Sequence, residues 1–208
     1  MAYTEGMVVT KLPKRAGRPR SFDADEALDR AMHVFWRKGF EGASLNDLTA
    51  AMKIQPASLY KAFGNKRALF EKALARYLAG PVAFVHDALS EPTAYAVADR
   101  ILRRTAEFFT EGRSRRGCMT IHAALAGGVE AAPIRRKLIA LRVKEQDALR
   151  RRFERAKSEG DLPGHANAAD LARFVTTIYQ GMTVQAIDGA SPEDLLLLAD
   201  TALQVWPK

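Results

Sequence analysis

A pair of short helices joined by a tight turn constrains the fold of this chain more than any other feature. Ser44 is a typical N-cap residue, and Asp47, three positions on, completes a variant of the capping box. A break at residues 53–55 follows, and Pro56 then opens a second helix, whose first turn has no need of the N–H that proline lacks. Gly64 ends this helix. The pattern predicts a helix-turn-helix.

Helices with one apolar side are predicted on both flanks of this pair. The first begins near Asp23 and ends at Gly39, and the other begins near Asn65 and reaches Gly80. A short helix can enter the major groove of DNA only if its neighbours hold it clear of the protein surface, so the apolar sides must pack on one another. The residues expected in this core include Met32, Trp36, Phe40, Leu59 and Phe63.

Further helical patterns fill the rest of the chain, and no stretch alternates apolar and polar residues long enough to indicate a sheet. They run over Pro92–Glu111, Arg115–Ala126, Pro133–Ser158, Ala168–Ile187 and Pro192–Val205. The fold class is therefore predicted as all-α, with about nine helices in total. We expect a flexible basic arm over residues 1–20, a three-helix helix-turn-helix head over 21–66, and a larger helical domain over 67–208.

The positive charge of the chain is concentrated in its N-terminal part. Residues 1–80 contain 14 Lys and Arg against 8 Asp and Glu, whereas residues 81–208 contain 18 against 16. This favours a polyanionic partner for the N-terminal part, although a basic soluble surface would give the same count. A single cysteine, Cys118, and the lack of a signal peptide or a membrane-length apolar run predict a cytoplasmic protein with no membrane partner.

The motifs of the N-terminal part together resemble a known family. They are Gly17-Arg18-Pro19-Arg20, Phe35-Trp36-Arg37-Lys38-Gly39-Phe40, Ser44-Leu45-Asn46-Asp47-Leu48, Ser58-Leu59-Tyr60-Lys61-Ala62-Phe63-Gly64-Asn65-Lys66 and Ala68-Leu69-Phe70. Over roughly residues 20–70 this pattern is similar to the DNA-binding domain of TetR/AcrR-family regulators. The resemblance implies a homodimeric all-α regulator, usually a repressor, that leaves its operator DNA when a small molecule enters the body. It thereby makes residues 67–208 a ligand-binding and dimerisation domain.

Mapped onto this sequence, the resemblance makes the helix after Pro56 the one that reads DNA. Ser58 could donate to a base or a phosphate, and Ala57 could contact a thymine methyl group. Lys66, at the start of the next helix, is a candidate for a phosphate, and the two arm arginines are candidates for the minor groove. Each basic residue could instead be a solvated surface charge. The candidate DNA-binding residues are Arg18, Arg20, Ser44, Gln55, Pro56, Ala57, Ser58, Tyr60, Lys61, Asn65 and Lys66.

Two positions depart from the family pattern. Lys53 occupies a turn position where the family usually has glycine, and Gln55 stands where serine or threonine is usual. If Lys53 adopts the left-handed conformation, a strain of roughly 1 kcal/mol follows. Gln55 is also a poor N-cap.

The last two predicted helices are the candidates for a homodimer interface, since two from each subunit can form a four-helix bundle. Alternatively, their apolar stripes cover the core of their own subunit. The stripes are Leu171, Phe174, Val175, Ile178 and Met182, followed by Leu195, Leu198, Ala199, Ala202 and Trp206.

An unidentified small-molecule effector is expected among the central helices. Aromatic and methionine residues at helical spacing could line its pocket, although such residues are more often ordinary core. The candidates are Phe84, Thr105, Phe108, Phe109, Cys118, Met119, His122, Phe174, Tyr179 and Met182, with Gln180 as a further polar group.

Cys118 and His122 lie four residues apart on one predicted helix, which places them on one face. A pKa lowered by the helix dipole and by neighbouring arginines would make Cys118 a reactive thiol for oxidants or electrophiles. The pair could also bind a metal together with His86, but no further ligand is evident, and a buried small cysteine is the favoured reading. No cofactor and no metal site are predicted.

Other functions fit the sequence less well. The histidines stand in no recognised catalytic arrangement, and motifs for phosphate loops, zinc proteases or a nucleophile elbow are absent, so an enzyme is not expected. A structural DNA-coating protein would need basic residues along the whole chain. An activator built on the same fold cannot be separated from a repressor by sequence.

Overall fold

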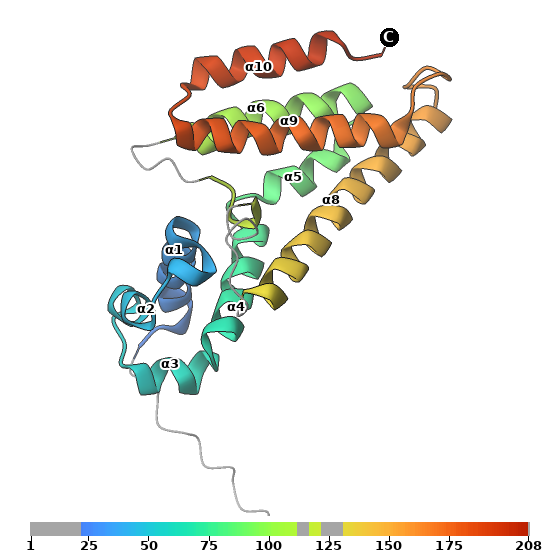
Figure 1. Cartoon of the computed structure of the whole chain (residues 1–208). Coiled ribbons are helices and arrows are strands. Elements are labelled where there is room, and N and C mark those ends of the chain that lie inside the picture. The colour runs from blue at the N-terminus through green and yellow to red at the C-terminus, as the bar shows by residue number, and fades with distance from the viewer. Residues whose placement is uncertain (1–21, 112–116, 122–130, 208) are drawn as a thin grey trace, which may run out of the picture.

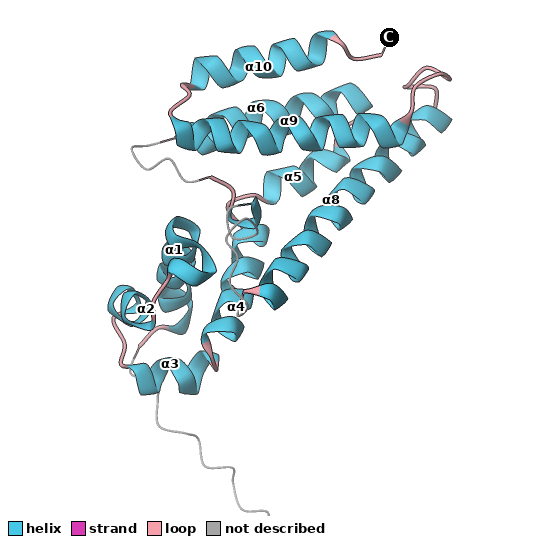
Figure 2. Cartoon of the chain, viewed as in Figure 1, coloured by secondary structure: helices cyan, strands magenta, loops and turns pink. Residues whose placement is uncertain are grey.

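The computed structural model describes residues 22–111, 117–121 and 131–207, and within these segments the regular structure is helical (Figure 2). The elements are α1 (Ala24–Gly42), α2 (Leu45–Met52), α3 (Pro56–Phe63), α4 (Lys66–Ala79), α5 (Ala83–Asp87), the 3₁₀ helix η1 (Ala88–Ser90), α6 (Ala94–Thr110), α8 (Ala132–Ser158), α9 (Ala168–Asp188) and α10 (Pro192–Gln204). The predicted all-α fold class is confirmed.

The first three helices form a small unit at one end of the molecule, here called the head (Figure 1). α1 packs against both α2 and α4, and α4 leads from the head to the remaining helices, here called the body. Gly39, where the first helix was predicted to end, breaks the helical path inside α1 with φ 68° and ψ −178°. The side chain of Asp23 caps α1 by accepting hydrogen bonds from the N–H groups of Asp25 and Glu26.

The body is a bundle in which α9 lies between α6 and α8 (Figure 1). The long α8 packs along α9 and reaches down towards α4, while α10 packs mainly on α6. The buried face of α6 shows why these helices associate. Its buried residues recur at helical spacing, so they form one apolar side of an amphipathic helix. They are Ala94, Val97, Ala98, Ile101, Leu102, Thr105, Ala106 and Phe109.

The predicted helices agree with the structure to within a few residues where they can be compared. The predicted helix over 115–126 can be compared only in part, because the structure describes only residues 117–121 of this stretch. Residues 119–121 are helical. Sequence reasoning missed α5 and η1, which follow Pro81. α5 has five residues and buries none of them fully, so it leaves no periodic apolar stripe to detect.

Candidate functional site

The inner side of α3 is apolar and the outer side is open to solvent. Leu59 and Phe63 are buried as predicted, and they belong to the same hydrophobic core as the aromatic residues of α1 and α4. In that core the rings of Phe35 and Phe70 meet edge to face, with centroids 5.1 Å apart. The predicted core positions Met32, Trp36 and Phe40 are buried as well. The inner side of α3 is therefore packed on an apolar core.

The start of α2 is fixed by a complete capping box. The backbone N–H of Asp47 donates to Ser44 Oγ at 3.0 Å, and the N–H of Ser44 donates to Asp47 Oδ2 at 3.0 Å. Lys38 Nζ donates to Asp47 Oδ1 at 2.7 Å. The hydrogen bonds from Lys38 and Ser44 hold the pKa of the Asp47 carboxyl well below its usual range. Ser44 itself is exposed at the end of the helix.

The turn between α2 and α3 contains the left-handed residue that was considered in the sequence analysis. Lys53 is left-handed, with φ 56° and ψ 42°, and among the described residues it alone combines a positive φ with a side chain. Gln55 occupies the N-cap of α3 without forming a side-chain cap. The positive end of the α3 dipole is thus left without a side-chain partner.

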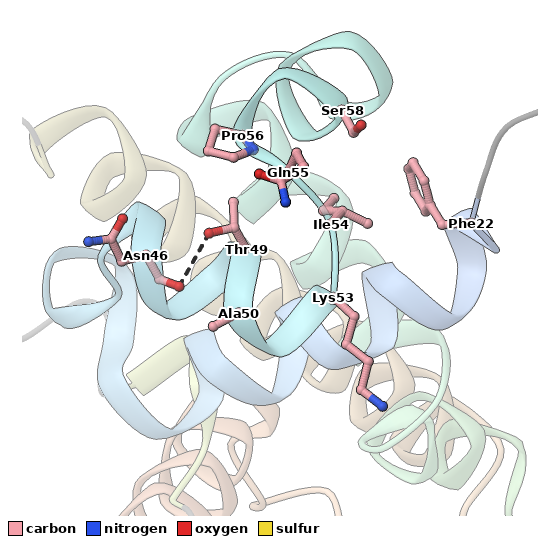
Figure 3. A pocket seen from close by; sticks show the side chains of 9 residues that line it. All are labelled: Phe22, Asn46, Thr49, Ala50, Lys53, Ile54, Gln55, Pro56 and Ser58. Carbon is pink, nitrogen blue, oxygen red and sulfur yellow. Dashed lines mark hydrogen bonds between the residues drawn. The ribbon is translucent and has the colours of Figure 1, made fainter.

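A hollow of about 560 Å³ lies between α2, the turn and the first residues of α3, and we call it the α2–α3 hollow (Figure 3). Asn46 and Thr49 enter it from α2, and Ser58 from α3 (Figure 3). The Thr49 hydroxyl donates to the carbonyl of Leu45 at 2.9 Å. The hollow is lined by Phe22, Asn46, Thr49, Ala50, Lys53, Ile54, Gln55, Pro56 and Ser58.

Sequence reasoning missed the contribution of α2 to this hollow. Asn46, Thr49, Ala50 and Lys53 follow one another at positions i, i+3, i+4 and i+7, and so they share one face of the helix. The opposite face carries the buried Leu48 and Met52. The sequence contained a signal for this contribution. This face of α2 is largely polar and leads into the predicted turn, so it was a candidate to lie beside the start of the next helix.

Most of the predicted DNA-binding residues lie together on the outer face of the head. Gln55, Pro56, Ala57, Tyr60 and Lys61 are exposed on or just before α3, and Ser58 is half-buried. Tyr60 is 50% exposed, so its ring and hydroxyl are accessible from the outer side of α3. The predicted contacts Arg18 and Arg20 lie outside the described residues.

The start of α4 lies beside this face. Asn65 is exposed and caps α4 by accepting a hydrogen bond from the N–H of Ala68 at 2.9 Å. Lys66 Nζ is 3.4 Å from the carbonyl oxygen of Glu41 and 4.8 Å from the centroid of the Phe40 ring. Its ammonium group is thus held against the head.

The body contains a cavity of about 540 Å³, which we call the body cavity. Residues of α4, α5, η1, α6, α8 and α9 line it. Among the described residues that were predicted to bind a ligand, Tyr179 lines this cavity and the others do not. The contacts with a ligand remain predictions.

The remaining candidates pack elsewhere, for ordinary reasons of core formation. Phe108 stacks on Trp36 at 5.8 Å and meets the rings of Phe84 at 5.8 Å and Phe109 at 5.0 Å. The Thr105 hydroxyl is bound to the carbonyl of Ile101 at 2.7 Å. Met119 and Met182 are buried, Phe174 is half-buried away from the cavity, and Gln180 does not line it. His122 lies outside the described residues.

Cys118 does not have the environment of a reactive thiol. It is 5% exposed, its Sγ lies 3.0 Å from Thr120 Oγ1, and burial raises the pKa of its thiol instead of lowering it. Since the thiolate is the reactive form, this environment agrees with the favoured prediction of a buried cysteine and not with the alternative of a thiol activated by the helix dipole and arginines. Within the described segments no group of His, Cys, Asp and Glu residues has a metal-binding arrangement.

The head is joined to the body by an aromatic contact as well as by α4. Trp36 Nε1 of α1 donates to the carbonyl of Gly117 at 2.5 Å, and its ring lies 4.9 Å from that of Tyr77 on α4. The backbone N–H of Met119 donates to the Tyr77 hydroxyl at 3.3 Å. The residues around Gly117 therefore connect α1 with the last turns of α4.

The apolar stripes predicted for dimerisation are only partly available. Leu195, Ala199, Ala202 and Trp206 are buried, because α10 packs on α6 of the same chain. Val175 and Met182 of α9 are buried too, whereas Leu171, Phe174, Ile178 and Leu198 are half-buried. Apolar side chains that sequence reasoning did not single out are more exposed, with Val184 at 37%, Leu197 at 65% and Val205 at 70%.

Comparison with known proteins gives a consistent result. The sequence model described as "Bacterial regulatory proteins, tetR family" matches residues 27–73. The chain is 33% identical over 198 residues to the HTH-type transcriptional repressor ComR of Escherichia coli (strain K12), covering 94% of both chains. It is 28% identical over 200 residues to the HTH-type transcriptional repressor BdcR of the same organism, covering 94% of this chain and 95% of that one.

Solved structures agree with this result. A cysteine mutant of the TetR family transcriptional regulator CifR, complexed with 26-bp double-strand operator DNA, superposes with a TM-score of 0.87 at 43% identity, covering 92% of this chain and 100% of that one. A TetR transcriptional regulator from Rhodococcus sp. RHA1 has a TM-score of 0.61 at 41% identity, with 89% and 100% covered. No helix within the described residues is long and apolar enough to cross a membrane.

Proposed function

Because the chain belongs to the TetR family of bacterial regulatory proteins and is a DNA-binding transcriptional regulator, we propose that it is a homodimeric repressor that a small molecule releases from its operator. The observation that carries the proposal is the exposed α3, with its uncapped N-terminus beside the α2–α3 hollow. The helix dipole at that end attracts phosphate, and the polar outer face of α3 is available to base edges.

In this proposal the residues of the head have different roles. Gln55 and Ser58 form hydrogen bonds with base edges, and Ala57 contacts a thymine methyl group. Asn46, which shares the hollow with them, is a further polar contact. The residues that position the head on the backbone are Ser44, Pro56, Tyr60, Lys61, Asn65 and Lys66, with Arg18 and Arg20 entering the minor groove.

Dimerisation follows from the geometry of DNA. Two heads about 34–36 Å apart meet successive major grooves on one side of the duplex. The exposed Val184 of α9 and Leu197 of α10, together with the half-buried Phe174 and Ile178, supply apolar surface for a partner. Ile178→Lys is expected to shift the protein to a monomer in analytical ultracentrifugation, whereas Val143→Lys, on the exposed side of α8, leaves the dimer intact.

A ligand in the body cavity can act on the head through α4. Leu78 and Ala79 of the last turn of α4 line the cavity, while the first turns of the same helix follow directly from α3. Arg76 Nη2 of α4 donates to Asp29 Oδ2 of α1 at 2.7 Å, so α1 and α4 move together. An occupant that shifts the end of α4 changes the spacing of the two heads and disfavours the operator complex. An activator would use the same device with a differently placed operator.

The test is fluorescence anisotropy of the purified protein with DNA from upstream of its own gene, beside scrambled DNA, over a salt series. We expect tight binding to the native fragment only, with an affinity that falls steeply as salt rises. Lys61→Ala is expected to weaken binding and to reduce the salt slope by about one. Lys144→Ala removes an exposed lysine of the body and is expected to leave both unchanged. Equal, weak binding to both fragments at every salt concentration would contradict sequence-specific recognition at this site.

A further inference from the structure

The walls of the body cavity are largely hydrocarbon. Leu78, Val82, Leu89, Ile101, Leu141 and Leu149 contribute side chains from α4, η1, α6, α8 and the residue before α5. A space of about 540 Å³ with such walls suits an apolar molecule of moderate size. On this basis alone the occupant could carry a charge of either sign or none.

A carboxylate breaks the apolar stripe of α8 inside this cavity. Glu145 lies between Leu141 and Leu149 on the side of α8 that faces the cavity. The hydroxyl of Tyr179 on α9 donates to Glu145 Oε2 at 3.0 Å. Among the described residues no lysine, arginine or histidine forms a salt bridge with Glu145. Burial raises the pKa of Glu145, because the charged form is poorly solvated there.

The arginine nearest in sequence does not neutralise this carboxylate. Arg142 is close enough to lower the pKa of Glu145, but this effect ranks below burial and the bond from Tyr179. Its Nη1 atom donates instead to the carbonyl of Thr120 at 2.5 Å. One N–H of the guanidinium is therefore bound to a backbone oxygen, and within the described part of the protein no salt bridge joins Glu145 to Arg142 or to another cation.

The other ionisable side chains that line the cavity are exposed. They are Lys144, Arg151, His86 and Asp87, of which Lys144 and Arg151 are positively charged and Asp87 is negatively charged. Exposed charges are screened by water and salt, so they discriminate little between ligands. Glu145 is the carboxylate that a ligand meets inside.

We propose that the body cavity binds an apolar amine in its protonated form, with the ammonium group on the carboxylate of Glu145 and the hydrocarbon part against the leucine and isoleucine walls. The ammonium supplies the partner that Glu145 lacks, and a charge-assisted hydrogen bond to a carboxylate is stronger than one between neutral groups. An anionic ligand of the same shape meets a like charge and is excluded. This proposal deepens the proposed function, since it names the chemical class of the molecule that releases the operator.

The first test is isothermal titration calorimetry of the DNA-free protein at neutral pH with three ligands of one shape: octylammonium, octan-1-ol and octanoate. We expect octylammonium to bind at least about tenfold more tightly than octan-1-ol, with octanoate the weakest. Equal binding of amine and alcohol, a preference for octanoate, or no binding of any of the three contradicts the proposal. The comparison uses the natural chain, so it does not depend on the folding of a variant.

Matched variants then test the residue itself. Glu145→Gln keeps the shape and can still accept a hydrogen bond from Tyr179, and it is expected to remove the preference for the amine over the alcohol. Glu154→Gln changes an exposed glutamate of the same helix and is expected to keep that preference. If Glu145→Gln folds normally and keeps the preference too, the charge of Glu145 is not the determinant.

The two proposals can fail separately. In the anisotropy assay octylammonium is expected to release the native fragment from the natural protein, with little release from Glu145→Gln. Specific operator binding without a preference for the amine contradicts only the ligand class. Amine binding without specific operator binding contradicts the proposed function and leaves the site in the cavity standing.

Discussion

The head and the body are built from the same kind of helix, but their interiors differ. The described buried residues of the head, on α1, α2, α3 and the start of α4, are apolar. The buried polar and charged residues all belong to the body, and they are Thr105, Thr120, Arg152, Thr176 and Thr183. The body also encloses the cavity with Glu145 and Tyr179.

Arg152 is the clearest example of the difference. It is 5% exposed, and its guanidinium donates to the carbonyls of Leu89, Glu91 and Pro92 at 3.2, 2.8 and 3.1 Å. Its Nη1 atom has no hydrogen-bond partner within the described structure. A buried cation costs free energy unless it is paired, so the head, which needs only a rigid outer face, contains none. In the body, Arg152 fixes the segment of residues 89–92, of which Leu89 lines the cavity.

The largest expected effect comes from opening the dry interior of the head. Phe35→Ala removes a fully buried ring and should lower the free energy of unfolding by about 3–5 kcal/mol, because the cavity it leaves cannot collapse completely. Urea denaturation followed by circular dichroism measures this change. Tyr60→Ala, on the exposed face of the same head, should change stability by less than about 0.5 kcal/mol while weakening operator binding. A small effect of Phe35→Ala would contradict a close-packed apolar interior of the head.

The polar interior of the body should respond next. Arg152→Met leaves three backbone carbonyls without their donor and is expected to cost about 2 kcal/mol. Arg151→Met, at the exposed neighbouring position, should cost almost nothing, since its ion pair with Asp147 is on the surface. The same denaturation experiment compares the two. A stabilised Arg152→Met protein would show that burying the charge costs more than its hydrogen bonds return.

Helix caps allow the two regions to be compared through one kind of interaction. Ser44 caps α2 in the head and Thr93 caps α6 in the body. Replacing either with alanine should cost about 1 kcal/mol of stability. Only Ser44→Ala should also weaken operator binding in the anisotropy assay, because α2 helps to form the α2–α3 hollow. Loss of operator affinity in Thr93→Ala would instead indicate that the cap of α6 is coupled to the head.

The smallest expected effect concerns backbone strain. Lys53→Gly relieves a left-handed residue and should stabilise the protein by about 0.5–1 kcal/mol, seen as a higher melting temperature. Gly160→Ala makes the opposite change at φ 82° in the body, where a Cβ would meet no neighbour within 4 Å, so strain alone should lower the melting temperature. If Lys53→Gly lowers it, the lysine side chain stabilises the turn by more than the strain costs.

The head could be predicted closely because its signals are local. Ser44, Pro56 and Gly64 each mark a helix end, whereas the left-handed conformation of Lys53 was raised only as a possibility, by comparison with the glycine usual in the family. The all-α class followed from periodicity in the same way. The roles of single residues toward DNA remain predictions, since a sequence shows which side chains are polar and not what they touch.

The body cavity could not be predicted in the same way, because it depends on how helices distant in sequence pack. Phe84, Phe108 and Phe109 were candidates for the lining of a pocket, but in the structure the ring of Phe108 packs on the other two. The signal that was overlooked is a charge at a position of the apolar stripe. Glu145 and Arg152 both occupy such positions on α8, between Leu138 and Ala156. A charged residue in the apolar stripe of a helix is either buried with hydrogen-bond partners, as Arg152 is, or lies beside a cavity, as Glu145 does.

The position of Trp36 has a practical consequence. The chain has 2 tryptophans, and the other, Trp206, packs against Phe153 with ring centroids 5.5 Å apart, near the C-terminus. In Trp206→Phe protein, all indole emission therefore comes from the contact between α1 and the residues around Gly117. If a ligand moves the head away from the body, water reaches that indole and its emission shifts to longer wavelength. The protein thus contains its own fluorophore at the joint, and the timing of release could be followed by stopped flow without attaching a dye.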